Sequence, residues 1–280
     1  MRVSAYVPCY NSSATIRDAV KSILDQTVPL DEVFVVDDGS TDGSAEIPGV
    51  RVVRIQRNQG RGTTRARAMQ EAKSDLVLGC DATLKLSPSF LENALHWFKQ
   101  DRVAAVFGEV RDESVALLGN RWRNRHIFRV DRVRRVQHFS PLITGCSIVR
   151  KSAAEAVGGF NPELLAAEDA DLGDRLLRAG FDIVSDPELW ASTAKRQSVW
   201  EVLERYARWN RSDKFGVCDY LRQIVFSVKV MAREDLRAND PPSVFVSLLS
   251  PHYQLWYSQM RSKRGLTGRC VAQDKTDDRH

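Results

Sequence analysis

The sequence contains few cysteines and no histidine pairs with metal-binding spacing. Its five cysteines are far apart and include no C-x-x-C pair, and its five histidines form no H-x-x-x-H or H-x-E pattern. Disulfide frameworks and zinc sites depend on such spacings. These absences exclude a disulfide-stapled domain and a histidine metal centre. The odd, scattered cysteines favour a reducing compartment, so we expect a cytoplasmic protein.

Long apolar runs and the common nucleotide motifs are also absent. No stretch approaches the ~20 apolar residues of a membrane-spanning helix, and residues 1–6 lack the apolar region of a signal peptide. There is no Walker A motif, Arg65 occupies the place of a third glycine after Gly60 and Gly62, and residues 145–149 do not match G-x-S-x-G. We expect neither secretion nor membrane insertion, and we exclude P-loop, dehydrogenase and serine-hydrolase classes.

The composition is that of an ordinary globular protein. Of its 280 residues, 43% are hydrophobic and 28% are charged, which is enough to bury a large core. Lys and Arg number 41 against 36 Asp and Glu, which gives a net charge of +5. So small an excess does not indicate a nucleic-acid partner, and we expect none.

Short apolar segments alternate with helical periodicity along most of the chain. We expect strands at 3–7, 33–36, 50–55, 76–78 and 143–149, and helices at 16–24, 65–72, 88–98, 152–157, 169–179 and 200–209. This alternation predicts an α/β fold with a mostly parallel sheet, helices on both faces and ligands at the carboxyl ends of the strands. We expect a sheet domain over 1–190, a helical extension over 191–257 and a flexible tail over 258–280.

Polar turns recur along this pattern at 8–11, 37–42, 80–83 and 168–171, and three of them contain acids. Carboxylates repel phosphate unless a divalent cation lies between them, and they can also accept hydrogen bonds from a base or a sugar. The set therefore indicates a nucleotide together with a metal ion. Taken alone, Asp37-Asp38-Gly39 is equally well explained as a simple turn.

An ordered series of segments between Val3 and about Asp186 resembles the inverting, nucleotide-sugar-dependent glycosyltransferases of family 2, which have the GT-A fold. The segments are V-S-A-Y-V-P-C-Y-N, V-V-D-D-G-S-T-D-G-S, R-N-Q-G-R-G-T-T-R-A-R-A, L-V-L-G-C-D-A-T and G-G-F-N-P-E-L-L-A-A-E-D-A-D-L-G-D-R-L-L-R-A-G-F. The resemblance implies a Rossmann-like GT-A sheet. It also implies transfer of a sugar from a nucleotide diphosphate, expected to be UDP, to a hydroxyl of a glycan, lipid-linked or small-molecule acceptor.

The resemblance also assigns positions to the nucleotide-sugar site. They are Pro8, Tyr10, Asn11, Asp37, Asp38, Arg65, Asp81 and Ala82. In this assignment Asp38, with Asp37, accepts from the base, and Arg65 meets the nucleotide. The chemistry is reasonable in itself, because a carboxylate accepts the imide N–H of a uracil and a guanidinium offers a fork of donors.

Asp81 matches the first acid of the family's D-x-D metal motif, but the motif here reads Asp81-Ala82-Thr83. Asp81 is therefore the expected ligand of Mg²⁺ or Mn²⁺, at a site weakened by the missing carboxylate. The stretch that matches a further histidine ligand, residues 190–196, contains no histidine. We hypothesise that Lys195 or Arg196 neutralises the diphosphate in its place.

Glu168 and Asp169 match the family's E-D pair, in which Asp169 corresponds to the catalytic base. Displacement at an anomeric carbon needs a carboxylate that takes the proton of the acceptor hydroxyl. The alternative is a helix cap, because carboxylates also stabilise helix N-termini. Gly145 falls on the family's acceptor side, with a strand bulge as the alternative.

Residues 121–136 hold seven arginines and one acid, Asp131. We expect this block, through Arg129 and Arg132, to bind an anionic acceptor or to contact an anionic membrane at its inner face; the alternative is a solvated surface.

Arg205 replaces the glutamine of a Q-x-x-R-W motif, so we expect a single transfer rather than processive synthesis. The alternative function is a non-catalytic or metal-independent protein that binds nucleotide sugars or glycans.

Overall fold

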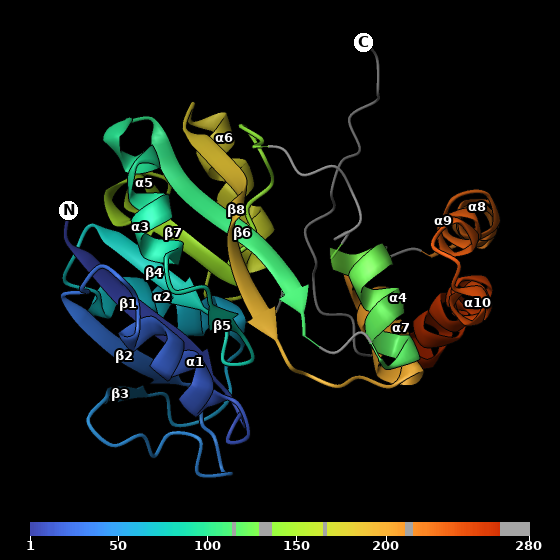
Figure 1. Cartoon of the computed structure of the whole chain (residues 1–280), viewed down its shortest axis with the longest axis horizontal. Helices are drawn as coiled ribbons and strands as arrows, with labels where there is room; N and C mark the ends of the chain where they lie inside the picture. Colours follow the sequence, from blue (N-terminus) through green and yellow to red (C-terminus); the bar gives the residue numbers. More distant parts are fainter. Residues whose placement is uncertain (114–115, 129–135, 165–166, 211–214, 264–280) are drawn as a thin grey trace. The chain divides into compact units, whose positions relative to one another are not determined.

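The computed structural model describes residues 1–113, 116–128, 136–164, 167–210 and 215–263 (Figure 1). The chain forms two compact units. The first, the sheet unit, comprises 1–113 and 132–194; the second, the helical unit, comprises 114–131 and 195–280. Residues 114–131 thus group with the C-terminal helices, and the expected domain bounds of 1–190 and 191–257 stay a prediction.

One eight-stranded sheet organises the sheet unit, in the order β3-β2-β1-β4-β7-β6-β8-β5. The strands are β1 (Val3–Cys9), β2 (Glu32–Asp37), β3 (Arg51–Arg54), β4 (Leu76–Cys80), β5 (Lys85–Leu86), β6 (Val103–Asp112), β7 (Cys146–Arg150) and β8 (Asp182–Thr193). Strands β1 to β4 pair in parallel, whereas β7 runs antiparallel to both β4 and β6. The expected α/β sheet flanked by helices is confirmed, as a mixed sheet.

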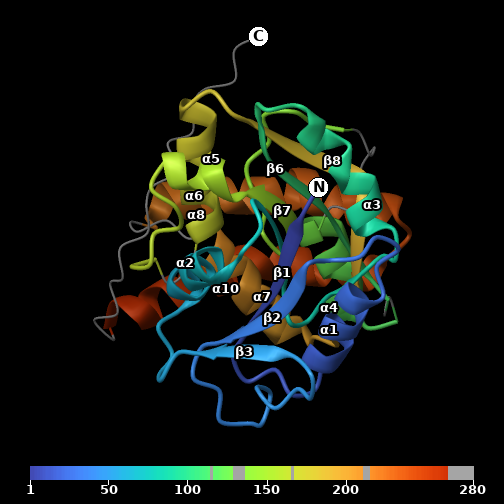
Figure 2. The ribbon, with the colours of Figure 1, turned by 90° about the vertical axis from the view of Figure 1, so that its left-hand side faces the viewer.

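Helices cover both faces of this sheet (Figure 2). They are α1 (Ile16–Leu24), α2 (Arg61–Glu71), α3 (Phe90–Leu95), α5 (Lys151–Ala156) and α6 (Glu168–Arg178). Because side chains alternate along a strand, Val3, Ala5 and Val7 of β1 join the core beneath α1 and α3. Tyr6 points the other way, into the core beneath α2, α5 and α6.

The start of α2 packs very closely on the loop before α6. A Cβ at Gly62 would lie within van der Waals overlap of the carbonyl oxygens of Asn161 and Leu164, and the Gly62 N–H donates to the Leu164 oxygen at 3.0 Å. Only glycine allows this approach of two backbones. The contact sets the spacing between α2 and the beginning of α6.

The helical unit contains α4 (Leu118–Arg123), α7 (Val199–Trp209), α8 (Val217–Phe226), α9 (Ala232–Arg237) and α10 (Pro241–Lys263). Trp122 is fully buried there among Val202, Leu203 and Met231. Ser198 and Glu201 form a capping box that begins α7. Helix α10 continues to Lys263, so residues 258–263 are helical where a tail was expected; 264–280 lie outside the described residues.

Within the described ranges, none of the helices combines the length and the apolar character that crossing a bilayer requires.

Candidate functional site

The carboxyl ends of β1, β2 and β4 lie along one edge of the sheet. Cys9 at the end of β1 pairs with Asp37 at the end of β2, and Tyr6 pairs with Gly79 near the end of β4. Because these strands are parallel, the turns that follow them meet at this edge. Three of the four polar turns are therefore neighbours in the structure, as expected.

The turn after β1 is tied to the turn after β2. The Asn11 side-chain oxygen accepts from the Thr41 N–H at 3.0 Å, and the Asn11 N–H donates to the Ser40 hydroxyl at 3.0 Å. Asn11 has a φ of 47°, which asparagine tolerates better than most residues. Pro8 is half-buried and Tyr10 is exposed, so the Tyr10 ring is open to a ligand.

Asp37 and Asp38 are buried and hold loops in place. The Asp37 carboxylate accepts from the Ser40 N–H at 3.1 Å. The two oxygens of Asp38 accept from the N–H groups of Gln59 and Gly60, both at 2.9 Å. These contacts fit the turn interpretation and fix the loop that leads into α2. Contact of Asp38 with a base stays a prediction.

Arg65 is buried and links the acids of the site. Its side chain is 3% exposed, and its guanidinium donates to Glu168 at 2.9 Å, to Asp81 at 2.8 Å, and to the Tyr6 hydroxyl and the Thr144 carbonyl at 3.1 and 3.3 Å. Contact of Arg65 with a nucleotide stays a prediction.

Electrostatics stabilise this buried arrangement. Burial alone would lower the pKa of Arg65, but Tyr6, Asp81 and Glu168 together raise it well above its ordinary value. Burial also raises the pKa of Tyr6, so its hydroxyl remains protonated. A guanidinium that is always charged and presents a planar fork of donors is suited to holding two carboxylates at once.

Glu168 and Asp169 begin α6, after Ala167 in the left-handed conformation. Glu168 is 1% exposed; one of its oxygens accepts from Arg65, and the other is buried without a hydrogen-bond partner among the residues that the structure describes. Asp169 is half-buried. Its Oδ1 accepts from the Ala170 N–H at 2.9 Å, but its Oδ2 meets the Thr144 N–H and hydroxyl only at 3.5 Å. Such long contacts are weak and leave Oδ2 able to take a proton.

The segment Thr144–Gly145 brings Asp81 and Asp169 to one place. Thr144 contacts Asp169 through its N–H and hydroxyl and accepts from Arg65 through its carbonyl, while the Gly145 carbonyl accepts from the Asp81 N–H at 2.8 Å. A Cβ at Gly145 would lie 3.6 Å from Asp81 Oδ2. Gly145 therefore lies directly beside the Asp81 carboxylate, and its acceptor-side role stays a prediction.

The predicted metal site offers few protein ligands. One Asp81 oxygen accepts from Arg65, and its other oxygen accepts no hydrogen bond from the described residues; the side chain is 34% exposed. Ala82 is buried and Thr83 is half-buried. Over the described ranges, no three His, Cys, Asp or Glu residues form a metal-binding group. The chain thus fits a divalent cation only as a single carboxylate ligand, with the remaining ligands supplied by the donor's phosphates and by water.

Two site residues were missed by the sequence reasoning. Tyr6 accepts a hydrogen bond from Arg65 inside the sheet, and Thr144 links Asp169 to Arg65. Strand alternation along β1 could have shown that Tyr6 points to the opposite face from Ala5 and Val7. No signal in the sequence pointed to Thr144 except its place before Gly145.

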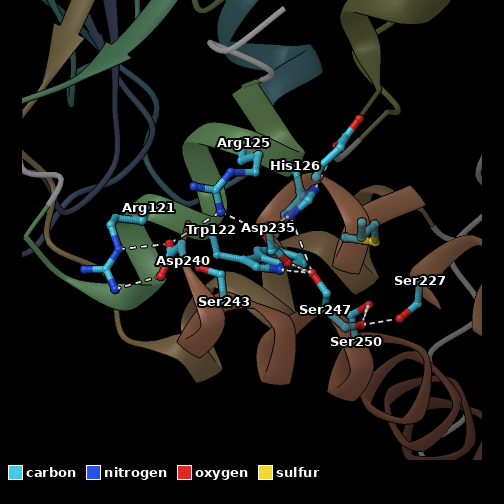
Figure 3. Close-up of polar contacts among 12 residues, drawn as sticks. Arg121, Trp122, Arg125, His126, Ser227, Asp235, Asp240, Ser243, Ser247 and Ser250 are labelled. Atoms are coloured by element: carbon cyan, nitrogen blue, oxygen red, sulfur yellow. Dashed lines mark hydrogen bonds and ion pairs between the residues drawn. The ribbon is translucent and has the colours of Figure 1, made fainter. Parts of the chain in front are cut away.

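The arginine block is neither a solvated surface nor an open anion site where it is described. Arg121 donates to both oxygens of Asp240 at 3.0 and 3.2 Å (Figure 3). Arg123 donates to Gln197 at 2.6 Å and Arg125 donates to Asp235 at 2.6 Å. These side chains are tied to partners within the helical unit. Arg129 and Arg132 lie outside the described residues, and their acceptor role stays a prediction.

Asp235 is the centre of this second network. It is fully buried, and its Oδ1 accepts from Arg125 and from the His126 ring at 2.8 Å, while its Oδ2 accepts from the Ser247 hydroxyl at 2.5 Å. Trp122 in turn donates to Ser247 at 2.9 Å (Figure 3). Both oxygens of this carboxylate are occupied by side chains of the same unit.

The tryptophans of the incomplete Q-x-x-R-W motif do not belong to the core. Trp200 and Trp209 are exposed on α7, and the guanidinium of Arg205 lies 5.7 Å from the centre of the Trp209 ring. Lys195 and Arg196, predicted to neutralise a diphosphate, also belong to the helical unit, and that role stays a prediction.

Comparisons with known proteins agree with this architecture. The model of the family "Glycosyl transferase family 2" matches residues 4–158. A hyaluronan synthase of Streptococcus pyogenes is 26% identical over 256 residues, which cover 81% of this chain and 59% of that protein. A poly-beta-1,6-N-acetyl-D-glucosamine synthase of Staphylococcus epidermidis is 23% identical over 221 residues, 74% of this chain and 53% of that protein. The chain thus spans somewhat more than half of these relatives.

Two solved structures share the fold across nearly the whole chain. S. aureus TarS 1–349 has a TM-score of 0.53 at 18% identity and covers 98% of this chain and 95% of its own. The mannosyltransferase PcManGT from Pyrobaculum calidifontis has a TM-score of 0.57 at 18% identity, with 96% and 76% covered. Identities this low show the fold alone.

Proposed function

This chain belongs to glycosyl transferase family 2, and from that premise we propose that it transfers a single sugar from a UDP-sugar to a hydroxyl acceptor with inversion. The expected GT-A type of fold is confirmed by the structural neighbours. Among these, TarS has been solved with UDP and with UDP-GlcNAc, which favours UDP as the donor nucleotide. A hydroxyl on a glycan, a lipid-linked sugar or a small molecule suits the acceptor role.

The convergence of Asp169 and Asp81 supports this proposal most strongly. An inverting displacement needs a base near the acceptor hydroxyl while the nucleotide diphosphate leaves from the opposite face of the sugar. Asp169 Oδ2 is held only by long contacts from Thr144, so it is the carboxylate oxygen best placed to take the acceptor's proton. Asp81 binds the same Arg65 and donates its N–H to the Gly145 carbonyl, and we assign it to the donor side.

Arg65 acts as a positioning residue in this scheme. It binds Glu168 and Asp81 through separate nitrogens and touches Thr144, which in turn contacts Asp169. Without its charge, Glu168 would be a buried carboxylate with no counter-ion, which is unfavourable in a low-dielectric interior. We infer that Arg65 holds Glu168 and Asp81 at a fixed spacing, and Asp169 through Thr144, before the donor binds.

A divalent cation fits the donor side of the site. Mg²⁺ or Mn²⁺ bound to Asp81 and to the diphosphate would neutralise the charge that develops on the leaving group. PcManGT, which shares the fold, was solved in complex with GDP-Man and Mn²⁺. Tyr10 is exposed at the end of β1 and offers its ring to the nucleotide.

The decisive experiment replaces Asp169 by Asn and measures sugar transfer and UDP-sugar hydrolysis. We expect turnover to fall by a factor of about 10² to 10⁴, the usual effect of losing a general base, while calorimetry shows unchanged UDP binding. The matched control is Asp174→Asn in the same helix, because Asp174 is exposed and its ion pair is with Arg178 on the surface. Equal turnover of wild type and Asp169→Asn would remove the proposed base.

The alternative function is a protein that binds a nucleotide sugar without transferring it, or that acts without metal. It is favoured by Thr83 in place of the second acid and by the single carboxylate ligand at the metal site. Binding of UDP without any hydrolysis or transfer, with and without Mn²⁺, would support this alternative.

We place the protein in the cytoplasm, because Cys9, Cys80 and Cys146 are buried free thiols, as in proteins of a reducing compartment.

A further inference from the structure

Helix α10 exposes large apolar side chains and buries several polar ones, which is the opposite of an ordinary surface helix. Its buried side contains Ser243, Ser247, Ser250 and Gln254 beside the apolar Val246 and Pro251. Its exposed side contains large apolar ones, namely Phe245, Leu248, Leu249, Trp256 and Met260. Residues 241–260 include no Asp, Glu, Lys or Arg. Surface helices of globular proteins normally place their apolar residues inward and their charges outward.

The preceding helical segment, 217–237, carries a second exposed apolar stripe. It comprises α8, a π-helical turn (Ser227–Met231) and α9 without interruption, and α8 has no buried residue. Val217, Leu221, Val225 and Val228 recur at helical spacing and are exposed, Val217 by 75%. Isolated exposed apolar residues are common, but two continuous stripes in one unit are not.

A row of basic residues lies beside the second stripe. Arg222, Lys229, Arg233 and Arg237 are all exposed and fall on one side of the helix by their spacing. Arg222 lies 4.0 Å from Asp219, and the other three form no ion pair with a carboxylate in the described part of the chain. The stripe is thus bordered by positive charge.

The two exposed stripes share one side of the helical unit. The Ser227 hydroxyl donates to the Ser247 carbonyl at 2.6 Å, and the Tyr220 hydroxyl contacts the His252 ring at 2.8 Å, so the two helices pack along each other. Helix α10 contacts α4 and α7, and Trp122 of α4 donates to Ser247. Asp235 of α9 binds Arg125 and His126 in the π-helical turn after α4 (Asn124–Phe128). Figure 1 shows α8, α9 and α10 together on one side of α4 and α7.

We propose that this outer helical face, formed by the two apolar stripes and the four basic residues, docks on the surface of an anionic lipid bilayer. A bilayer interface accepts apolar side chains, an indole at the headgroup level and flanking Lys or Arg in a single arrangement. The combination of a charge-free segment, 241–260, that exposes large apolar side chains with a one-sided basic border is complementary to such a surface. The proposal goes beyond the sugar-transfer function and does not depend on it.

Vesicle co-sedimentation of the full chain tests the proposal without any substrate. We expect binding to vesicles of equal parts phosphatidylcholine and phosphatidylglycerol, weakened by salt, and little binding to phosphatidylcholine alone. The triple variant Phe245→Ser, Leu249→Ser, Trp256→Ser should bind at least about tenfold more weakly, because its apolar contact with the bilayer is lost. Leu24→Ser, at an exposed apolar residue of α1, is the matched control and should bind as wild type.

A second variant removes charge and leaves the apolar residues in place. Arg222→Gln, Arg233→Gln, Arg237→Gln should weaken binding by roughly fivefold per charge, or about a hundredfold together. Arg178→Gln, an exposed arginine on α6, should have no effect. Equal binding to neutral and anionic vesicles, or an unchanged affinity of the charge variant, would overturn the proposal.

Tryptophan fluorescence keeps the test independent of variant folding. In the wild-type chain, vesicles should shift the emission to shorter wavelength, and Trp256→Phe should bind equally while losing most of that shift. If the protein instead forms a dimer that the serine variant dissociates, as measured by light scattering, the face is a subunit interface and the proposal is wrong. No shift and no binding would also overturn it.

Discussion

The two units of this chain each bury an arginine among carboxylates, but they leave different groups open. In the sheet unit, Arg65 pairs with Glu168 and Asp81, yet one Glu168 oxygen has no partner in the described part of the chain and Asp81 is partly exposed. In the helical unit, both oxygens of Asp235 are occupied by Arg125, His126 and Ser247. Carboxylate oxygens that remain available indicate a candidate site, whereas carboxylates whose oxygens are all hydrogen-bonded indicate a structural network. The number of charges, which is similar in the two units, does not separate them.

The largest effect is expected at Arg65. Arg65→Gln leaves Glu168 buried without its counter-ion, and we expect the free energy of unfolding to fall by about 3–5 kcal/mol, as measured by urea denaturation. Turnover of UDP-sugar should fall with it, even for the folded fraction. Arg67→Gln is the control on the same helix, because Arg67 is half-exposed and pairs with Glu71 at the surface; its cost should be about 0–1 kcal/mol. A wild-type stability for Arg65→Gln would contradict the buried pairing.

Asp235→Asn tests whether the network of the helical unit is structural and separate from the candidate site. Removing this charge leaves Arg125 with a poorer partner in a buried network, and we expect a loss of about 2–4 kcal/mol in unfolding free energy. UDP binding by the folded protein, measured by calorimetry, should stay the same. Glu234→Gln, one residue earlier and a third exposed, should change stability much less. Loss of UDP binding at unchanged stability would show that this network belongs to the site.

The smallest effect is expected in how the free energy of unfolding depends on pH in the acid range. Burial raises the pKa of Asp240, but hydrogen bonds from Arg121 and Ser243 lower it to about 2, below its ordinary value of 3.8. Because the folded-state pKa is depressed, this carboxylate stabilises the fold above about pH 4, and the contribution is lost as the pH falls toward 2.

The measurement is urea unfolding of wild type and Asp240→Asn across this range. The stability difference between them should be constant at neutral pH and should shrink steadily between about pH 4 and pH 2. Asp25→Asn, at an exposed acid of the sheet unit, serves as the control. A difference that does not change with pH would mean that the Arg121 pairing contributes nothing.

Much of the sheet and its edge could be predicted from the sequence. Apolar segments at the right spacing identified β1, β2, β3, β4 and β7 but not β5, β6 or β8. Parallel strands bring Asp37 and Asp81 to one edge whatever the details of packing. The direction of β7 could not be predicted, because a strand of five buried or half-buried residues gives no sign of which way it runs.

The buried arginines were the main failure of prediction. Local sequence suggests that Arg121 and Arg125 are solvated, since the one acid nearby is Asp131. Their partners, Asp240 and Asp235, are more than a hundred positions away in the sequence. The position of a charged residue inside a protein is decided by such distant partners, and a periodicity argument does not contain them.

Gly62 limits which substitutions the beginning of α2 can accept. Its main chain lies so close to two carbonyl oxygens that even a methyl group has no room. A variant with any side chain there must give up the N–H contact to Leu164 or move the first turn of α2, and Arg65 is three residues further along that turn. The position of Arg65 therefore depends on the absence of a Cβ at residue 62.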